Sequence, residues 1–210
     1  MATYHLGSDQ WPIDQSGRRA TYWDMRKGLV YYHTLANFVQ VIGHEARSLI
    51  DIGSAACRYI EWFDWIPDRV SLDIANPSSA PGVRPIKADF LEWRPDKIYD
   101  VVLCSQVLEH VDDAGRFAEK LLSIGKRVLA SVPYNWPAGS VGGHVHDPVN
   151  QEKMDGWFGR EPDHALVVRE PFAEERLFCF YDVSRAPTDN QGLNRLLLLM
   201  NRPLSKETDR

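Results

Sequence analysis

The pattern of apolar and polar positions changes along the chain. Between Tyr22 and Val41, apolar residues recur at helical spacing, which predicts a helix. From Ser48 onward, short apolar runs alternate with amphipathic stretches, and such alternation predicts an α/β fold with a doubly wound parallel sheet. Five runs read as strands of this sheet: SLIDIG (48–53), RVSLDIA (69–75), IKADF (86–90), YDVVLCSQV (99–107) and KRVLASVP (126–133).

The stretches between these strands carry helix signals. CRYIEWFDWI (57–66) predicts a helix that Pro67 ends, whereas PSSAPGVRP (77–85) reads as a loop or a degraded helix. Asp112 and Asp113 precede AGRFAEKLLSIG (114–125), where Gly125 is the expected stop. For PVNQEKMDGWF (148–158), Asp147 is the expected N-cap, with Pro148 at the first helical position.

The last third of the chain has a different pattern. HALVVRE (164–170), RLFCFYDV (176–183) and LNRLLLLMNR (193–202) follow one another without a long helix. The last two predict a strand hairpin around APTDNQG (186–192), which would close the parallel sheet. At the other end, residues 1–21 are polar and broken by Pro12 and Gly17. We therefore expect an N-terminal arm or lid over 1–21 and a single domain over 22–210.

Composition narrows the class of protein. A chain of 210 residues suffices for one well-buried domain, and a net charge of −5 does not suggest a general nucleic-acid-binding surface. No apolar run approaches the roughly 20 residues that span a bilayer, and the N-terminus lacks the apolar core of a signal peptide. Cys57, Cys104 and Cys179 lack disulfide or metal spacing, so we expect buried free thiols and a cytoplasmic protein.

Candidate chemistry lies where the predicted strands end, because open α/β sheets bind ligands at the carboxyl ends of their strands. Asp51, Gly53 and Ser54 follow the first strand, and Gly53 permits a tight turn or the close approach of a ligand. Asp73 follows the second strand, where a carboxylate can accept hydrogen bonds from ribose hydroxyls. The alternatives are a plain strand–helix turn at Gly53 and a helix cap at Asp73.

Two further strand ends carry polar and aromatic groups. Asp89 and Phe90 suit an adenine, whose amine donates and whose ring stacks; the alternative is a loop aspartate beside a core phenylalanine. In SQVLEHV (105–111), Glu109 and His110 could act as a general base or as hydrogen-bond partners of a substrate. For His110, packing against the next helix is an equal alternative.

The loop VPYNWPAGSVGGHVHDP (132–148) has the glycines and aromatics of a substrate pocket. His144 and His146 alternate, so in an extended segment they face opposite ways and at most one points into the site. Both histidines with Asp147 could also hold a divalent metal, although helix capping by Asp147 competes with that role. Metal dependence stays open.

These stretches together resemble the class I S-adenosylmethionine-dependent methyltransferases. IDIGS is similar to their first motif, LDIA to the acidic motif after the second strand, and KADF to the adenine-side motif. YDVVLCSQVLEHVDD matches most closely, and GGHVHDPVNQEKMDGWF resembles the segment in which a Gly-His pair precedes a helix. The resemblance implies a Rossmann-like sheet of order 3-2-1-4-5-7-6, with strand seven inserted antiparallel between strands five and six.

The resemblance also implies roles for the strand-end residues. Gly53 and Ser54 would face the methionine part of S-adenosylmethionine, Asp73 the ribose, and Asp89 with Phe90 the adenine. Ala55 and Cys57 stand in place of two expected glycines, which disfavours a nicotinamide enzyme because its pyrophosphate needs a closer backbone. The full set expected to bind the cofactor is Asp51, Gly53, Ser54, Asp73, Ile74, Asp89, Phe90, Ser105 and Gln106.

The acceptor is less defined than the cofactor. A hydroxyl acceptor benefits from a general base, and we rank His144 first, then Glu109, His110 and His146. Tyr134, Trp136 and Trp157 suit a sugar ring or a planar molecule, so O-methylation of a saccharide or related small molecule is the first hypothesis; the alternative is that these aromatics pack the core and the lid. The alternatives are N-methylation of a small amine and a non-catalytic cofactor-binding partner protein, and a homodimer is left open.

Overall fold

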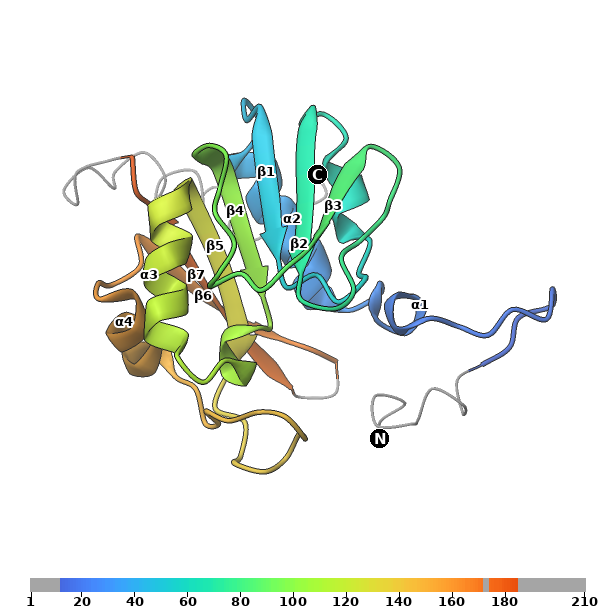
Figure 1. Ribbon diagram of the computed structural model, residues 1–210. Coiled ribbons are helices and arrows are strands. Elements are labelled where there is room, and N and C mark those ends of the chain that lie inside the picture. Colours follow the sequence, from blue (N-terminus) through green and yellow to red (C-terminus); the bar gives the residue numbers. More distant parts are fainter. Residues whose placement is uncertain (1–11, 172–173, 185–210) are drawn as a thin grey trace, which may run out of the picture.

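The computed structural model describes residues 12–171 and 174–184, and its centre is a seven-stranded sheet (Figure 1). The strands lie in the order β3-β2-β1-β4-β5-β7-β6. The five strands from β3 to β5 run parallel, while β7 pairs antiparallel with both β5 and β6. The strand bounds are β1 Ser48–Ile52, β2 Asp68–Asp73, β3 Val83–Lys87, β4 Tyr99–Ser105, β5 Gly125–Pro133, β6 His164–Arg169 and β7 Glu175–Asp182.

The predicted Rossmann-like order 3-2-1-4-5-7-6 is confirmed, but the terminal hairpin is formed by other strands than expected. HALVVRE supplies β6 and RLFCFYDV supplies most of β7. The predicted partner LNRLLLLMNR lies outside the described residues. Because β5 and β6 occupy both edges of β7, no edge of β7 is left for a third strand. The third predicted strand also begins earlier, since β3 starts at Val83 and ends at Lys87.

The single helix expected over 22–41 is two helices, α1 (Tyr22–Arg26) and α2 (Val30–Ile42). The break has a tertiary cause. The buried carboxylate of Glu170 accepts hydrogen bonds from the backbone N–H groups of Val30 and Tyr31, each 2.9 Å long. A side chain 139 residues away therefore caps a new helix at this point, which periodicity within the segment could not reveal.

The other helices depart from expectation in smaller ways. The stretch expected as a helix over 57–66 forms only the 3-10 helix η3 (Tyr59–Phe63), and a second short 3-10 helix, η4 (Leu108–His110), follows β4. Asp113 caps α3 (Ala114–Ile124) as predicted, by accepting a hydrogen bond from Arg116 N. Gly125 ends α3 as predicted, although its backbone is extended and leads directly into β5.

The prediction that Asp147 caps the fourth helix is wrong. Asn150 is the N-cap of α4 (Gln151–Phe158), where its side chain accepts from Lys153 N. Pro148 therefore precedes the helix instead of opening it. Asp147 is left for another partner, which lies at the site described below.

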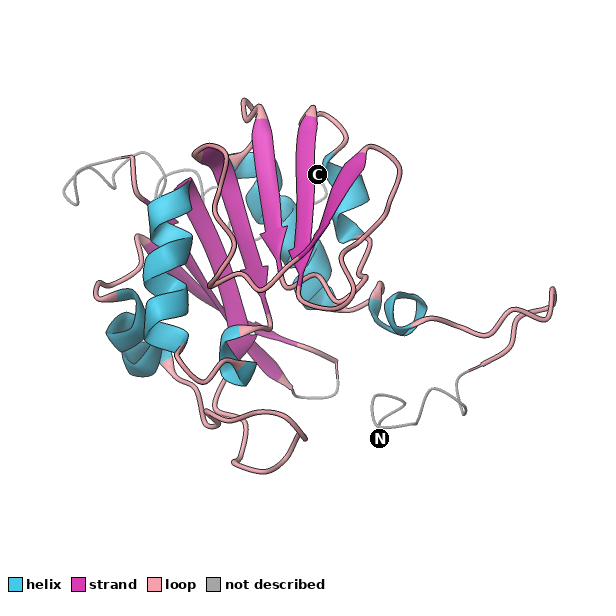
Figure 2. Ribbon diagram, viewed as in Figure 1, coloured by secondary structure: helices cyan, strands magenta, loops and turns pink. Residues whose placement is uncertain are grey.

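Helices cover both faces of the sheet (Figure 2). One face packs against α3 and α4, and the other packs against α2 and η3. Each layer has its own buried apolar cluster, and Cys57, Cys104 and Cys179 are buried free thiols within them, as expected. Among the described residues, no helix is long and apolar enough to cross a membrane.

Candidate functional site

A cavity of about 580 Å³ lies at the carboxyl ends of the parallel strands. In Figure 1 this is the lower edge of the sheet, where α1, η4 and the loop after β5 also lie. Six of the nine residues expected to bind a cofactor line this cavity: Gly53, Asp73, Ile74, Asp89, Phe90 and Gln106. Its other walls come from Tyr22, Ile52, Ala55, Leu72, Ala88, Leu91, Val107, His110, Val111, Asp112, Asp113 and Phe117.

The turn after β1 is tight even though two expected glycines are absent. Gly53 has a φ of +80°, and Ala55 and Ala56 also adopt left-handed conformations with φ of 47° and 60°. Left-handed backbone costs an alanine roughly 1–2 kcal/mol, so the surrounding contacts must hold these residues in place. Ala56 N donates to Asn76 O and Gly53 N donates to Leu72 O, which ties the turn to the end of β2.

Gly53 is the position in this turn that admits no side chain. A Cβ at Gly53 would lie 2.4 Å from Cγ2 of Val107, well inside van der Waals contact. The missing side chain thus lets η4 approach β1 and leaves the backbone of the turn open to the cavity. Sequence analysis assigned Gly53 to a tight turn or to the close approach of a ligand, and the neighbour that its bare backbone admits here is Val107.

We expect Gly53→Ala to lower both stability and ligand affinity. The left-handed φ alone costs an alanine roughly 1–2 kcal/mol. The added Cβ would also clash with Val107, and relief of this clash requires movement into the cavity. Thermal unfolding and calorimetry with S-adenosylhomocysteine, the demethylated form of the cofactor that the resemblance implies, measure the two effects. Gly156→Ala is the matched control, because it lies in α4 with open space around its Cβ and should stabilise by roughly 0.5–1 kcal/mol. An unchanged melting temperature in Gly53→Ala would contradict the assigned role.

Asp73 holds the turn from the end of β2. Its Oδ2 accepts from Ala55 N at 2.9 Å, and its Oδ1 accepts from Ala75 N and Asn76 N at 2.8 Å. A carboxylate has about four acceptor sites, so these three bonds leave capacity for about one further donor from the cavity. Asp73 is therefore compatible with both earlier interpretations, a local backbone cap and a ligand acceptor, because it accepts from nearby backbone N–H groups and also lines the cavity.

Three predicted cofactor residues do not line the cavity. Ser54 is buried, where its hydroxyl accepts from Ser71 Oγ at 2.8 Å and from Ser78 N at 3.2 Å. Ser105 pairs through its hydroxyl with Ser131 at 2.9 Å. Asp51 is fully buried beneath the turn and accepts a hydrogen bond of 2.6 Å from the Tyr59 hydroxyl. These residues support the cavity wall from behind.

Burial raises the pKa of Asp51 to about 7, so this carboxyl group titrates in an unusual range. An unfolded aspartate has a pKa near 3.9. Between pH of about 4 and 7, the folded state therefore holds a proton that the unfolded state has lost, and stability falls as pH rises. The loss is at most about 1.4 kcal/mol per pH unit and levels off above pH 7.

We expect Asp51→Asn to remove this decline in stability. The amide oxygen can still accept from the Tyr59 hydroxyl, while the proton equilibrium is absent. Urea unfolding of both proteins at pH 5, 6 and 7 measures the difference. The free energy of unfolding of the variant, relative to that of the wild type, should rise at each step in pH. Parallel pH profiles for the two proteins would show that Asp51 is ionised in the folded state.

Asp89 and Phe90 lie together at the end of β3, on the side of the cavity away from the loop after β5. Asp89 Oδ1 accepts from Leu91 N at 2.8 Å, which keeps the carboxylate at the turn. The Phe90 ring packs at 4.5 Å from that of Phe117, which comes from α3. Both residues line the cavity, but the Phe90 ring is buried in the apolar cluster that packs against α3, as the alternative of a core phenylalanine also predicted.

A smaller cavity of about 180 Å³ adjoins the first one and shares Tyr22, Gln106 and His110 with it. Gln106 lies at the junction with a left-handed φ of 58°, and its amide donates to Ser131 Oγ. Strained backbone of this kind clusters at functional sites. The remaining lining residues are Arg26, Leu29, Tyr31, Glu109, Pro133, Trp136, Val141, His144, Glu174 and Arg176.

The three residues ranked first as candidate bases meet in this smaller cavity. Glu109, His110 and His144 each offer one ligand-type atom, and these atoms lie within 4.8 Å of one another. Glu109 is almost completely buried, and burial, with a smaller effect from Asp147, raises its pKa to about 8. His110 donates from Nδ1 to Gly143 O at 2.9 Å, and burial lowers its pKa.

His144 has the geometry of an oriented base. Its Nδ1 lies 2.6 Å from Oδ2 of Asp147, so the carboxylate holds the proton on Nδ1 and leaves a lone pair on Nε2. The ring stacks near Trp136 at 5.9 Å and meets His110 edge-on at 4.6 Å. Sequence analysis missed this role of Asp147, because Pro148 suggested a helix cap instead.

His146 faces away from His144, as the alternation predicted. Its Nε2 lies 2.7 Å from Val111 O, and its ring packs against Trp157. Among the described residues, neither His146 nor Trp157 lines either cavity, and the same holds for Tyr134. The predicted metal set of His144, His146 and Asp147 is therefore not brought together by this loop.

Arg176 is a site residue that sequence analysis did not find. It lies on β7 and is buried against Trp136, with its guanidinium carbon 4.4 Å from the ring centroid. An ion pair of 3.3 Å joins it to Glu174. Only the antiparallel placement of β7 beside β5 brings this arginine to the smaller cavity, so no local signal could have shown it.

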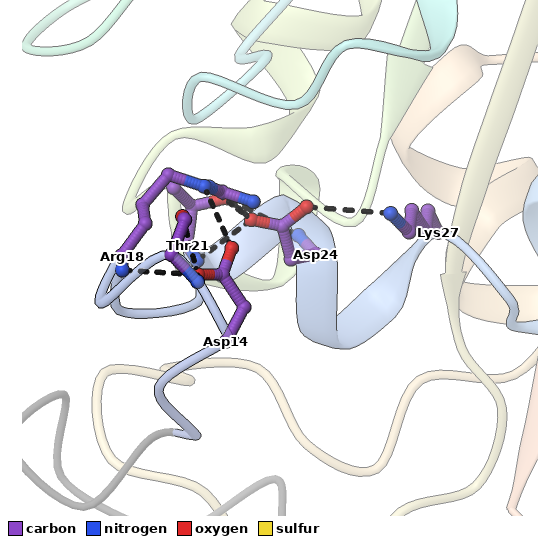
Figure 3. Close-up of polar contacts among 6 residues, drawn as sticks. Asp14, Arg18, Thr21, Asp24 and Lys27 are labelled. Atoms are coloured by element: carbon purple, nitrogen blue, oxygen red, sulfur yellow. Dashed lines mark hydrogen bonds and ion pairs between the residues drawn. The ribbon is translucent and has the colours of Figure 1, made fainter.

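A polar network joins the described part of the N-terminal arm to α1 (Figure 3). Asp24 Oδ2 accepts from Arg18 Nη1 at 2.8 Å and from Thr21 Oγ1 at 2.9 Å, while Lys27 approaches Oδ1 at 3.3 Å. These hydrogen bonds, with that of Arg18 the largest, lower the pKa of Asp24. The network fixes the start of α1, from which Tyr22 lines both cavities.

Comparison with known proteins supports the fold of this site. No protein-family model matches the sequence, and no curated protein does either. The solved structure of Burkholderia thailandensis 1,6-didemethyltoxoflavin-N1-methyltransferase, with bound 1,6-didemethyltoxoflavin and S-adenosylhomocysteine, is similar with a TM-score of 0.59 and 16% identity. The match covers 75% of this chain and 80% of that chain.

Two further solved structures are similar. The N-terminal domain of EvdMO1, crystallised in the presence of S-adenosylhomocysteine and D-fucose, has a TM-score of 0.55 and 12% identity over 83% of this chain and 91% of that chain. The N-methyltransferase NodS from Bradyrhizobium japonicum, in complex with S-adenosylhomocysteine, has a TM-score of 0.53 and 12% identity over 77% and 92%. The chain therefore has the fold of these methyltransferases.

Proposed function

We propose that this protein transfers a methyl group from S-adenosylmethionine to a hydroxyl group of a small molecule, with a saccharide as the first candidate. The observation that carries the proposal is a pair of adjoining cavities. The larger has acidic groups at two strand ends, and the smaller is lined by His144, whose Nδ1 lies 2.6 Å from Asp147. Gln106 and His110 line both, so a ligand in one cavity can meet a ligand in the other.

The residues of the larger cavity fit S-adenosylmethionine. At about 580 Å³ the cavity lies within the range of small-molecule sites. The bare backbone at Gly53 would lie beside the methionine part, Asp73 would accept from the ribose, and Asp89 with Phe90 would hold the adenine. This cofactor has no phosphate, so the alanines of the turn do not obstruct it. When bound, it supplies a methyl group that is already strongly electrophilic.

The chain's own part in the reaction is to place and deprotonate the acceptor. An acceptor hydroxyl in the smaller cavity would give its proton to Nε2 of His144 as its oxygen takes the methyl group. Asp147 accepts the proton of Nδ1 and so fixes the ring orientation and the neutral tautomer with its lone pair on Nε2, which is the arrangement of an oriented general base. Trp136 and Tyr31 supply apolar faces for a sugar ring in the same cavity.

We extend the proposal to the N-terminal arm, residues 1–21, which we propose acts as a lid over the cavities. The described part of this arm is mostly exposed, and the Asp24 network joins it to α1 (Figure 3). Because Tyr22 lines both cavities, movement of α1 would change access to each of them. Closure over bound ligands would exclude water from the transfer step.

The second candidate is N-methylation of a small amine. Two of the similar solved structures are named as N-methyltransferases. An amine needs little help from a base, so the His144–Asp147 pair favours the hydroxyl acceptor over the amine. The two candidates therefore differ in how strongly turnover depends on His144.

Calorimetry with S-adenosylhomocysteine tests the cofactor first. We expect saturable binding at one site per chain, and no binding at millimolar ligand would overturn the proposal. Mass spectrometry then follows the conversion of S-adenosylmethionine to S-adenosylhomocysteine with D-fucose, D-glucose, D-glucosamine and simple primary amines. Methylation of an oxygen supports the first candidate, and methylation of nitrogen alone supports the second. Binding without methylation of any acceptor would favour a non-catalytic partner protein.

A further inference from the structure

We infer that Glu109, His110 and His144 bind a divalent transition-metal ion in the smaller cavity. Their ligand-type atoms lie within 4.8 Å of one another, and Oε1 of Glu109 is 4.0 Å from Nε2 of His110. This set differs from the His144, His146 and Asp147 set that the sequence suggested. It combines Glu109 and His110, which are neighbours in η4, with His144 from the loop after β5.

Both imidazoles are held in the way that metal-ligating histidines usually are. Such histidines donate one ring N–H to a carboxylate or a backbone carbonyl, which fixes the ring and leaves the other nitrogen for the ion. His110 donates from Nδ1 to Gly143 O, and His144 donates from Nδ1 to Asp147. In each ring, Nε2 is therefore the nitrogen with a lone pair.

Glu109 supplies an independent observation. Its side chain is 1% exposed, and within residues 12–171 and 174–184 neither carboxylate oxygen has a hydrogen-bond partner. Burying a carboxyl group without partners is costly, and a bound ion is one of the few explanations for such a group. The adjacent imidazole nitrogens show where that ion would lie.

The two segments that carry these residues are fastened together. Val145 N donates to Glu109 O at 2.9 Å, and the His110–Gly143 bond joins the same two segments. A tetrahedral ion with ligand distances of about 2.1 Å holds its ligand atoms about 3.4 Å apart. The three atoms therefore need to approach by roughly 1 Å, within reach of small side-chain rotations on a fixed backbone.

The donor set selects a class of ion. Two imidazoles and one carboxylate suit Zn²⁺, Co²⁺ or another first-row transition metal, whereas Mg²⁺ and Ca²⁺ favour sites made of oxygen ligands. Three protein ligands leave a position open toward the cavity, where an acceptor oxygen could be bound and its pKa lowered. This catalytic role rests on the proposed function, but the ion site itself does not.

With the ion bound, His144 is a ligand and cannot also take the acceptor proton. The two roles of His144 therefore belong to the loaded and the metal-free protein respectively. Activity that withstands thorough chelation would assign His144 as the base. Activity that is lost on chelation and restored by the ion would assign it as a ligand.

Titration of the chelator-treated full chain with Co²⁺ tests the site directly. We expect one Co²⁺ per chain, with visible d–d absorption that reports nitrogen and oxygen ligands at low coordination number. Glu109→Gln and His144→Ala should each raise the Kd for Co²⁺ at least 10-fold. His146→Gln is the matched control, because it changes a histidine of the same loop and can still donate to Val111 O.

Several outcomes would overturn the site. These are no Co²⁺ binding at millimolar ion, binding that Glu109→Gln and His144→Ala leave unchanged, or binding that His146→Gln abolishes. Thermal unfolding checks each variant, and the isosteric Glu109→Gln carries the test if His144→Ala does not fold. Calorimetry of the chelated protein with S-adenosylhomocysteine is read separately, so failure of the ion site and failure of the proposed function are distinguishable.

Discussion

Replacement of His144 by alanine should lower the rate of methyl transfer by 10²–10⁴-fold, the range that a positioned general base contributes. The expected loss follows from the geometry of the smaller cavity. Asp147 lies 2.6 Å from Nδ1, so Nε2 is the basic atom, and alanine removes it without altering the larger cavity. The affinity for S-adenosylhomocysteine should therefore stay within about twofold of the wild-type value.

The rate is measured with whichever acceptor of the saccharide and amine panel supports turnover, by formation of S-adenosylhomocysteine. His146→Gln is the control, since His146 contacts Val111 and lines neither cavity among the described residues. Asp147→Asn gives a second test, because an amide can donate to Nδ1 and would move the proton to Nε2. A rate that survives His144→Ala would remove this residue from the reaction, both as a base and as a metal ligand.

Replacement of Asp73 by asparagine should weaken the binding of S-adenosylhomocysteine by roughly 10–100-fold. A hydrogen bond to a charged group contributes about 1.5–3 kcal/mol, and the change removes the charged acceptor expected for the ribose. Asparagine has one acceptor oxygen where the carboxylate now serves three backbone N–H groups. The NH₂ group of the asparagine would therefore face at least one backbone N–H donor. The turn that carries Ala55 should loosen as a result.

Calorimetry well below the melting temperature separates affinity from stability. Asp68→Asn is the matched control, because Asp68 lies at the opposite end of β2, where it pairs with Lys97. Binding that is weakened in Asp73→Asn and unchanged in Asp68→Asn supports the ribose contact. Equal affinity in both variants and in the wild type would show that the larger cavity does not hold a ribose at Asp73.

Strand-end residues could be predicted because the parallel strands place their carboxyl ends at one edge, whatever the details of packing. Gly53, Asp73, Asp89 and Gln106 were found in this way, and all line the larger cavity. Ser54 and Ser105 were assigned to the same cavity but point elsewhere. Their position after a strand was read correctly, whereas the direction of each side chain depends on the path of the turn.

The sequence by itself determined the order of apolar runs, and with it the doubly wound parallel sheet and the edge that carries the cavities, whereas the strand order was implied by the resemblance to class I methyltransferases. The parallel sheet and that edge follow from local periodicity and from the handedness of strand–helix–strand connections. Tertiary structure decided the rest. Glu170 breaks the first predicted helix, and β7 brings Arg176 to the smaller cavity. Asp147 pairs with His144 instead of capping the helix. Each of these features depends on a contact between different elements. A side chain binds the partner that packing places near it, and the sequence pattern of a single segment does not indicate that partner.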